Sequence, residues 1–130
     1  MPGNAKTFQN YREIGARYEA MAADYLEKKG YEILDRNFHH HRNGEIDLMA
    51  RQGKYLVCVE VKYRAGVAHG DPLEAVTFKK RLALSRLALA YLMKKGYPMD
   101  TPLRFDVIGI YGDDGEIRHI ENAFEYTSFS

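Results

Sequence analysis

Two short segments near the middle of the chain, GEIDL at residues 44–48 and VEVK at residues 59–62, constrain its fold more than any other feature. In the second segment valines alternate with polar residues, and this period of two is typical of a β-strand with one buried face. A turn centred on Gln52-Gly53 separates the two segments. We therefore expect residues 45–50 and 55–63 to pair as an antiparallel hairpin.

Acidic side chains and a lysine gather on one face of this predicted hairpin. Glu60 and Lys62 point the same way because every second residue of a strand shares a face. If the loop has two or four residues, Asp47 falls opposite Cys58 and becomes a diagonal neighbour of Glu60, roughly 7 Å away at the backbone. Glu45 shares its face with Asp47 and is expected near Glu60, as a metal ligand or a supporting residue.

Carboxylate pairs of this kind are typical ligands of Mg²⁺ or Mn²⁺, which prefer oxygen donors. A lysine beside them can orient or deprotonate a water molecule, or neutralise charge that develops on a phosphate. The pattern therefore predicts a metal-dependent site for phosphodiester chemistry, with Asp47, Glu60 and Lys62 as its catalytic residues.

The same motifs carry a wider resemblance. The segments GARYEAMAADYL (15–26), GYEILDRN (30–37), GEIDL (44–48) and VEVKYR (59–64) resemble the YraN-type family of small bacterial endonuclease-like proteins. That family belongs to the PD-(D/E)xK restriction-endonuclease-like superfamily and is similar to Holliday-junction resolvases; the resemblance covers about residues 11–111. It implies a metal site at Asp47, Glu60 and Lys62, with Glu19 as an additional acid and a two-fold homodimer as the assembly. We include Glu45 and Val61 in the expected metal-binding set.

The remaining patterns predict the order αβββαββ, an α/β fold in which helices flank a mixed β-sheet. After a flexible stretch at 1–10, helical spacing predicts a helix over 11–29, and a strand follows at 31–38. Beyond the hairpin we expect a loop at 65–70, a short helical turn, and a helix capped by Thr77 that runs to residue 95. Strands at 103–111 and 116–120 complete the domain, which spans residues 11–121 and leaves a tail at 122–130.

Basic side chains near the predicted metal site are candidates for nucleic-acid contact. A helix start favours anions, and Lys79, Lys80 and Arg86 crowd the first half of the second helix. We therefore assign phosphate contacts to Lys79 and Lys80 first, then Arg64, with Arg86 as a further candidate. A solvated charged helix face explains the same cations. The net charge is only +1, so any contact with nucleic acid depends on local clustering.

Two other groups of polar residues are assigned structural roles. The run His39-His40-His41 is interpreted as a polar loop beside the sheet, because neighbouring strand residues point in opposite directions. Asp106 is expected either to form a salt bridge with Arg104 or to hold an edge position, and it is left out of the catalytic set.

Composition indicates one compact domain: the chain has 130 residues, of which 45% are hydrophobic. No apolar stretch has the length of a membrane span and no signal-peptide pattern is present, so we expect a cytoplasmic protein that does not bind membranes.

Three interpretations of function remain. The first is a nuclease that acts on DNA, including branched or otherwise structured DNA, with Mg²⁺ or Mn²⁺ as cofactor. The second is a nucleic-acid-binding module of the same fold that does not cleave, and the third is a protein-interaction domain in which Glu60 and Lys62 form an ion network.

Overall fold

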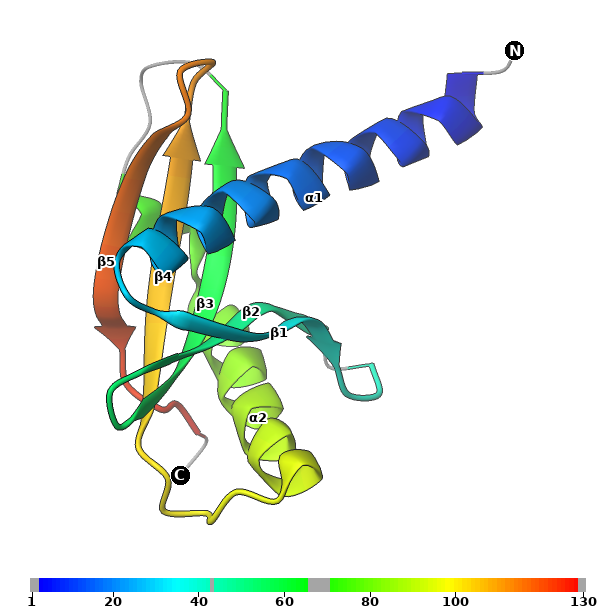
Figure 1. The fold of residues 1–130 in the computed structure, drawn as a ribbon. Helices are drawn as coiled ribbons and strands as arrows, with labels where there is room; N and C mark the ends of the chain where they lie inside the picture. Colours follow the sequence, from blue (N-terminus) through cyan, green and yellow to red (C-terminus); the bar gives the residue numbers. More distant parts are fainter. Residues whose placement is uncertain (1–2, 43, 66–70, 129–130) are drawn as a thin grey trace.

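A computed structural model describes residues 3–42, 44–65 and 71–128 of the chain (Figure 1). Its elements follow the expected order αβββαββ, with a 3₁₀-helix added before the second α-helix. They are α1 (Gly3–Lys28), β1 (Glu32–His39), β2 (Glu45–Gln52), β3 (Tyr55–Arg64), the 3₁₀-helix η1 (Pro72–Ala75), α2 (Phe78–Lys95), β4 (Leu103–Tyr111) and β5 (Glu116–Phe124).

The five strands form one mixed sheet in the order β1-β2-β3-β4-β5. Strands β3 and β4 are parallel, whereas the other neighbouring pairs are antiparallel. A parallel pair needs a long connection, and here η1 and α2 supply it. Figure 1 shows that β1 and β2 run steeply across the direction of β3, β4 and β5. The expected mixed sheet is confirmed.

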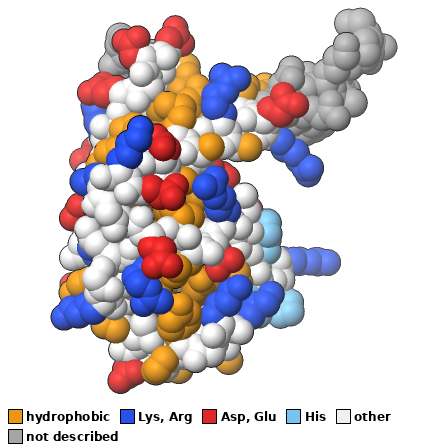
Figure 2. Space-filling view, in the orientation of Figure 1, with side chains coloured by type: hydrophobic (Ala, Val, Ile, Leu, Met, Phe, Trp, Pro, Cys, Tyr) orange, Lys and Arg blue, Asp and Glu red, His pale blue; other side chains and the backbone are white. Residues whose placement is uncertain are grey.

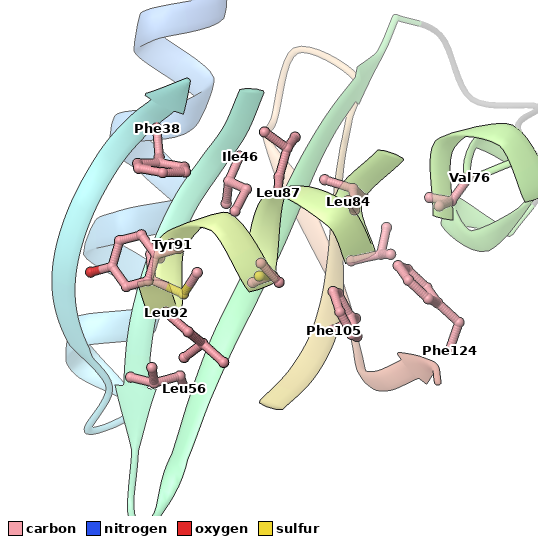
Figure 3. Packing of buried hydrophobic residues seen from close by; sticks show 14 residues of the cluster. Phe38, Ile46, Leu56, Val76, Leu84, Leu87, Tyr91, Leu92, Phe105 and Phe124 are labelled. Carbon is pink, nitrogen blue, oxygen red and sulfur yellow. The ribbon is translucent and has the colours of Figure 1, made fainter. Parts of the chain in front are cut away.

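The two helices pack against opposite faces of the sheet and create two hydrophobic layers. One layer joins Leu87, Tyr91 and Leu92 of α2 to sheet residues such as Ile46 and Leu56 (Figure 3). The other layer joins the C-terminal half of α1 to the opposite face; its buried members are Ala22, Ala23, Leu26, Tyr31, Leu48, Ala50, Val57, Val59, Ile108 and Ile110.

Strand β3 has the alternation that its sequence predicts. Val57 and Val59 belong to the layer under α1, and Cys58 belongs to the layer under α2. Glu60 and Lys62 follow Cys58 at spacings of two, so they project toward the α2 side near the end of the strand.

The start of α2 is fixed by its cap. Thr77 has extended backbone angles, and its Oγ1 accepts a hydrogen bond from the N–H of Lys80 at 3.2 Å. This is the usual N-cap arrangement. It holds Lys80 in the first turn of α2, on the helix that covers the Glu60 side of the sheet.

Two element boundaries differ from the expected ones by more than two residues. Helix α1 begins at Gly3 rather than near residue 11, and its N-terminal turns extend beyond the sheet (Figure 1). No proline interrupts residues 3–10, so nothing local ends the helix there. Strand β5 continues to Phe124, whose ring stacks on Phe105 with centroids 4.8 Å apart. Residues 66–70 of the expected loop lie outside the described part of the chain.

Charged side chains of both signs are interspersed over the face shown in Figure 2, in keeping with the small net charge. Within the described residues, no helix combines the length and apolar character needed to cross a membrane.

Candidate metal centre

The hairpin that carries the acidic motif has a register different from the expected one. Gln52 pairs with Tyr55, so Gly53 and Lys54 form a two-residue turn, in which Gly53 has a φ of 57°. A positive φ at the first turn position suits glycine and places the turn one residue later than predicted. The expected pairing of Asp47 with Cys58 is therefore wrong, because Met49 pairs with Cys58.

The corrected register brings Asp47 and Glu60 together more directly. The described ladder between β2 and β3 runs from Gln52–Tyr55 to Leu48–Val59, and Asp47 is the next residue of β2. Its Oδ2 accepts a hydrogen bond from the backbone N–H of Val61 at 2.8 Å. The carboxyl groups of Asp47 and Glu60 share a hydrogen bond. The side chain of Asp47 thus occupies the place where β2 and β3 separate.

Glu60 is a buried acid with an incomplete set of partners. Only 2% of the residue is exposed. Its Oε2 lies 3.5 Å from the ammonium nitrogen of Lys62 and 3.3 Å from that of Lys80, and it accepts no hydrogen bond from the described part of the chain. A buried carboxylate oxygen without a hydrogen bond is unfavourable unless a charge satisfies it. The two ammonium groups offset the charge of this oxygen without hydrogen bonding to it, so a cation that coordinates it directly would complete its partners.

Two further acids lie close to Asp47: Glu19 from α1 and Glu45 from the same strand, β2. One carboxylate oxygen from each of Glu19 in α1, Glu45 in β2 and Asp47 can be chosen such that all three lie within 4.8 Å of one another. These three residues and Glu60 line a single pocket of about 300 Å³. Magnesium and manganese bind oxygen donors and retain several waters, so the donor set and the open pocket fit such an ion.

The crowding of acids changes their proton affinity. Burial, followed by the neighbouring Glu60 carboxyl, raises the pKa of Asp47 from its ordinary 3.8 to about 9, although the N–H of Val61 acts in the opposite direction. Burial and repulsion by Glu45 also raise the pKa of Glu19. Without a cation the cluster therefore retains protons, and a divalent ion would have to displace them.

The other candidate residues are divided between this pocket and other surfaces. Val61 contributes its backbone N–H to Asp47, and Lys62 lines the pocket beside Glu60. Lys79 is exposed in the first turn of α2, next to Lys80. Arg64 is exposed and donates a hydrogen bond to the carbonyl of Tyr63 at 2.9 Å.

Arg86 is not brought to the acidic pocket. It lines a separate groove of about 630 Å³ on the outer side of α2, together with His40 and Lys94. The exposed helix position that made Arg86 a candidate directs it away from the carboxylates.

Sequence reasoning missed two residues at the edge of the cluster and the role of a third. His39 Nε2 lies 3.0 Å from Glu45 Oε2, and the side chain of Asn37 forms a hydrogen bond with Glu19. His39 reaches Glu45 because β1 continues to His39, and these two residues are partners in the β1–β2 ladder. Extending the predicted β1 by one residue would have brought His39 to the acids. The contact of Lys80 with Glu60 had no local signal, since it depends on how α2 packs.

Asp106, the other buried acid of the sheet, has a complete set of partners. It accepts hydrogen bonds from Arg104 at 2.9 Å and from the backbone N–H of Asn122 at 3.0 Å, and His119 Nε2 lies 2.8 Å away. Burial by itself would raise the pKa of Asp106, but these hydrogen bonds lower it below the ordinary value. The expected salt bridge with Arg104 is confirmed, and Asp106 has a structural role.

A five-stranded mixed sheet flanked by two helices defines an α/β fold with a restriction-endonuclease-like arrangement. Comparison with known proteins identifies the family. A family model described as "Uncharacterised protein family UPF0102" matches residues 18–110, and the chain belongs to this family. The matched residues include all four acids of the pocket.

The relatives cover nearly the whole chain. A UPF0102 protein of Geobacter sulfurreducens is 50% identical over 115 residues, which are 86% of this chain and 88% of the relative. A UPF0102 protein of Lachnoclostridium phytofermentans is 46% identical over 116 residues, or 89% of this chain and 96% of the relative. A third UPF0102 protein, from Rhodococcus jostii, is 44% identical over 114 residues, which are 85% of this chain and 95% of the relative. The resemblance to the YraN-type family is thereby confirmed.

Proposed function

We propose that this protein is a metal-dependent nuclease that hydrolyses phosphodiester bonds in DNA, including branched or otherwise structured DNA. The observation that carries the proposal is the buried Oε2 of Glu60, which accepts no hydrogen bond from the described residues and belongs to a side chain that lines an open pocket with three more acids. Structural acids in protein interiors normally have their partners, as Asp106 does.

The donor set favours Mg²⁺ or Mn²⁺ over zinc, which is usually held by nitrogen and sulfur ligands. The residues that would hold the ion are Asp47 and Glu60, with Glu19 and Glu45 as further oxygen donors. When bound, such an ion supplies an activated water and neutralises charge on the phosphate.

The residues around the acids have roles of their own. The Val61 N–H holds the Asp47 carboxylate in place. Lys62, whose side-chain nitrogen lies 3.5 Å from Glu60 Oε2, can stabilise as an ammonium the charge that develops on the phosphate, or can take a proton from water as a neutral amine. Lys80 adds a second ammonium group from the N-terminal turn of α2, where the helix dipole also favours an anion.

Cations outside the pocket extend the same electrostatic surface. Lys79 is exposed on α2 and precedes Lys80 in the chain. Arg64 is exposed at the end of β3, two residues after Lys62. Exposed lysines and arginines hold a nucleic-acid backbone through phosphate contacts that weaken with salt. They position the strand and do not select its sequence.

A cleavage assay tests this proposal. Labelled single-stranded, duplex, flapped and four-way DNA are incubated with Mg²⁺ or Mn²⁺ and with wild type, Asp47→Asn, Glu60→Gln or Lys62→Ala. Asp24→Asn is a matched control, because Asp24 is an exposed acid paired with Lys28 on α1. We expect metal-dependent product from the wild type and the control only.

The other outcomes are equally informative. Cleavage that survives Glu60→Gln would refute the assigned site. If the wild type retains DNA at low salt but no form yields product, the protein is a binding module. If neither DNA nor metal is bound, the acids and lysines form the ion network of a protein-interaction domain.

A further inference from the structure

One wall of the acidic pocket is apolar and belongs to α1. Tyr11, Ile14, Gly15 and Tyr18 line the pocket together with the carboxylates. Their spacings of three and four residues place them on one face of the helix. Tyr11 is 67% exposed and Ile14 is 39% exposed, so large hydrophobic groups face solvent directly beside a charged site. Exposed apolar groups that gather at a polar site are typical of a binding surface.

The aromatic part of this wall has a defined orientation. The rings of Tyr18 and Tyr63 are stacked, with centroids 3.9 Å apart and planes inclined by 11°. Tyr63 follows Lys62 in β3, so the stack joins the α1 wall to the strand that carries the catalytic lysine. A flat π-surface is therefore fixed next to the ammonium groups of the pocket.

Gly15 leaves open space in the same wall. It lies inside a long helix, where glycine is less favourable than alanine. Among the described residues, and apart from its chain neighbours and its own helix backbone, a Cβ atom built on Gly15 would meet no atom within 4 Å. Close packing within the protein therefore does not require a glycine here, and its absent side chain widens the pocket between Tyr11 and Tyr18.

We propose that the wall formed by Tyr11, Ile14, Gly15 and Tyr18 is a stacking site for an unpaired nucleobase, so that the substrate class is nucleic acid with a single-stranded segment. This inference rests on the proposed nuclease function and extends it from the phosphate to the base.

The chemistry of a nucleotide matches both sides of the pocket. An unpaired base offers a flat apolar face that stacks on aromatic side chains whatever its sequence. Its phosphate is an anion, and Lys62 and Lys80 supply the opposite charge in the same pocket. A base inside a duplex is already stacked and paired, so it must first be unstacked to reach the wall.

Binding measurements on single-stranded and duplex DNA test the proposal. A labelled 12-nucleotide strand and its blunt duplex are titrated by fluorescence anisotropy with Ca²⁺ in place of Mg²⁺, and the DNA is checked afterwards for cleavage. Gly15→Leu adds a side chain to the wall at a position where a Cβ atom meets nothing among the described residues outside its own helix backbone within 4 Å, and leucine favours the helix. Tyr11→Ala removes an exposed ring, and Ala20→Leu adds a leucine at another exposed position of α1.

We expect Gly15→Leu and Tyr11→Ala to weaken single-strand binding by about 5- to 100-fold, which is the range of one lost stacking contact. Duplex binding should change less than about twofold, and Ala20→Leu should resemble the wild type. A strand that contains 2-aminopurine gives a second readout. The chain has no tryptophan, so the probe is excited selectively, and its emission should fall on binding to wild type but not to Gly15→Leu.

Several results would overturn this inference. Unchanged single-strand affinity in both wall variants would refute it while leaving the nuclease proposal intact, and so would an equal loss for single strand and duplex. A wall variant that changes the monomer–dimer equilibrium but not DNA affinity would show that a second copy covers the wall. If the wild type retains no DNA at all, the proposed function and the stacking site both fail.

Discussion

Replacing Asp47 with asparagine should stabilise the metal-free protein near neutral pH. Asp47 is held beside the Glu60 carboxyl in a largely buried place, which raises its pKa to about 9 from 3.8. Between these two values the folded protein keeps a proton that the unfolded chain has lost. The free energy of unfolding therefore falls as the pH rises above about 4. Asparagine is neutral in both states and can still accept the hydrogen bond from the N–H of Val61.

The size of the effect follows from the same pKa values. Each unit of pKa difference corresponds to about 1.4 kcal/mol, so the interval from 3.8 to pH 7 sets an upper limit of about 4 kcal/mol. Asp47 also lines an open pocket, where water screens part of the repulsion. Single stabilising substitutions commonly contribute about 0.5–2 kcal/mol. We therefore expect Asp47→Asn to raise the free energy of unfolding by about 1–2 kcal/mol at pH 7.

Urea unfolding in EDTA at pH 4 and pH 7 measures this difference. The gain from Asp47→Asn should be present at pH 7 and should nearly vanish at pH 4, where both states of the wild type hold the proton. Asp24→Asn, which changes an exposed carboxylate, should stay within about 0.5 kcal/mol of the wild type. Added Mn²⁺ should stabilise the wild type and not Asp47→Asn. An Asp47→Asn variant that is no more stable than the wild type at pH 7, or whose gain does not depend on pH, would refute the reasoning.

Three further predictions concern other parts of the structure. Because protons compete for Asp47, Mn²⁺ affinity measured by calorimetry should rise from pH 6 to pH 8; a flat profile would exclude this acid as a ligand. Asp106→Ala leaves the guanidinium of Arg104, 11% exposed, without its carboxylate and should lower the free energy of unfolding in urea by about 3–5 kcal/mol; a loss below 1 kcal/mol would contradict a structural role. Lys80→Gln should reduce the slope of log Kd for DNA against log salt by about 1, whereas Lys94→Gln in the outer groove should leave it unchanged; equal slopes for both variants would remove Lys80 from the phosphate site.

Much of the fold could be predicted because the informative patterns are local. The alternation in β3, the capping Thr77 and the glycine at Gly96, which has a φ of 76°, each specify one element from neighbouring residues. The long helix between β3 and β4 then allowed the crossover that a parallel pair needs. The hairpin register was wrong because two adjacent positions could each form the turn. Only the left-handed backbone of Gly53 decides between them.

The candidate site was less predictable because it combines residues from four separate elements. Asp47 and Glu60 share a hairpin, so strand geometry alone brings them together. Glu19 reaches the cluster only because α1 crosses the end of the sheet, and Lys80 only because α2 begins where it does. Arg86 has the same local character as Lys80, yet it lines a groove on the outer side of α2. The spacing of residues along the sequence predicts on which face of a helix each side chain lies. It does not predict which other element that face packs against.

The two buried acids of the sheet show which observation separates a functional from a structural carboxylate. Glu60 and Asp106 lie on neighbouring parallel strands, where Val59 pairs with Asp106 and Glu60 with Val107. Both acids are at most 2% exposed, so neither burial nor position distinguishes them. Asp106 is surrounded by Arg104, His119 and a backbone N–H. Within the described part of the chain, Oε2 of Glu60 accepts no hydrogen bond and has two ammonium groups as neighbours, at 3.3 and 3.5 Å. A buried charge that the fold leaves incompletely satisfied persists when something else completes it. Under the proposed function, a divalent cation in the adjoining pocket would do so, with the chemistry that phosphodiester hydrolysis requires.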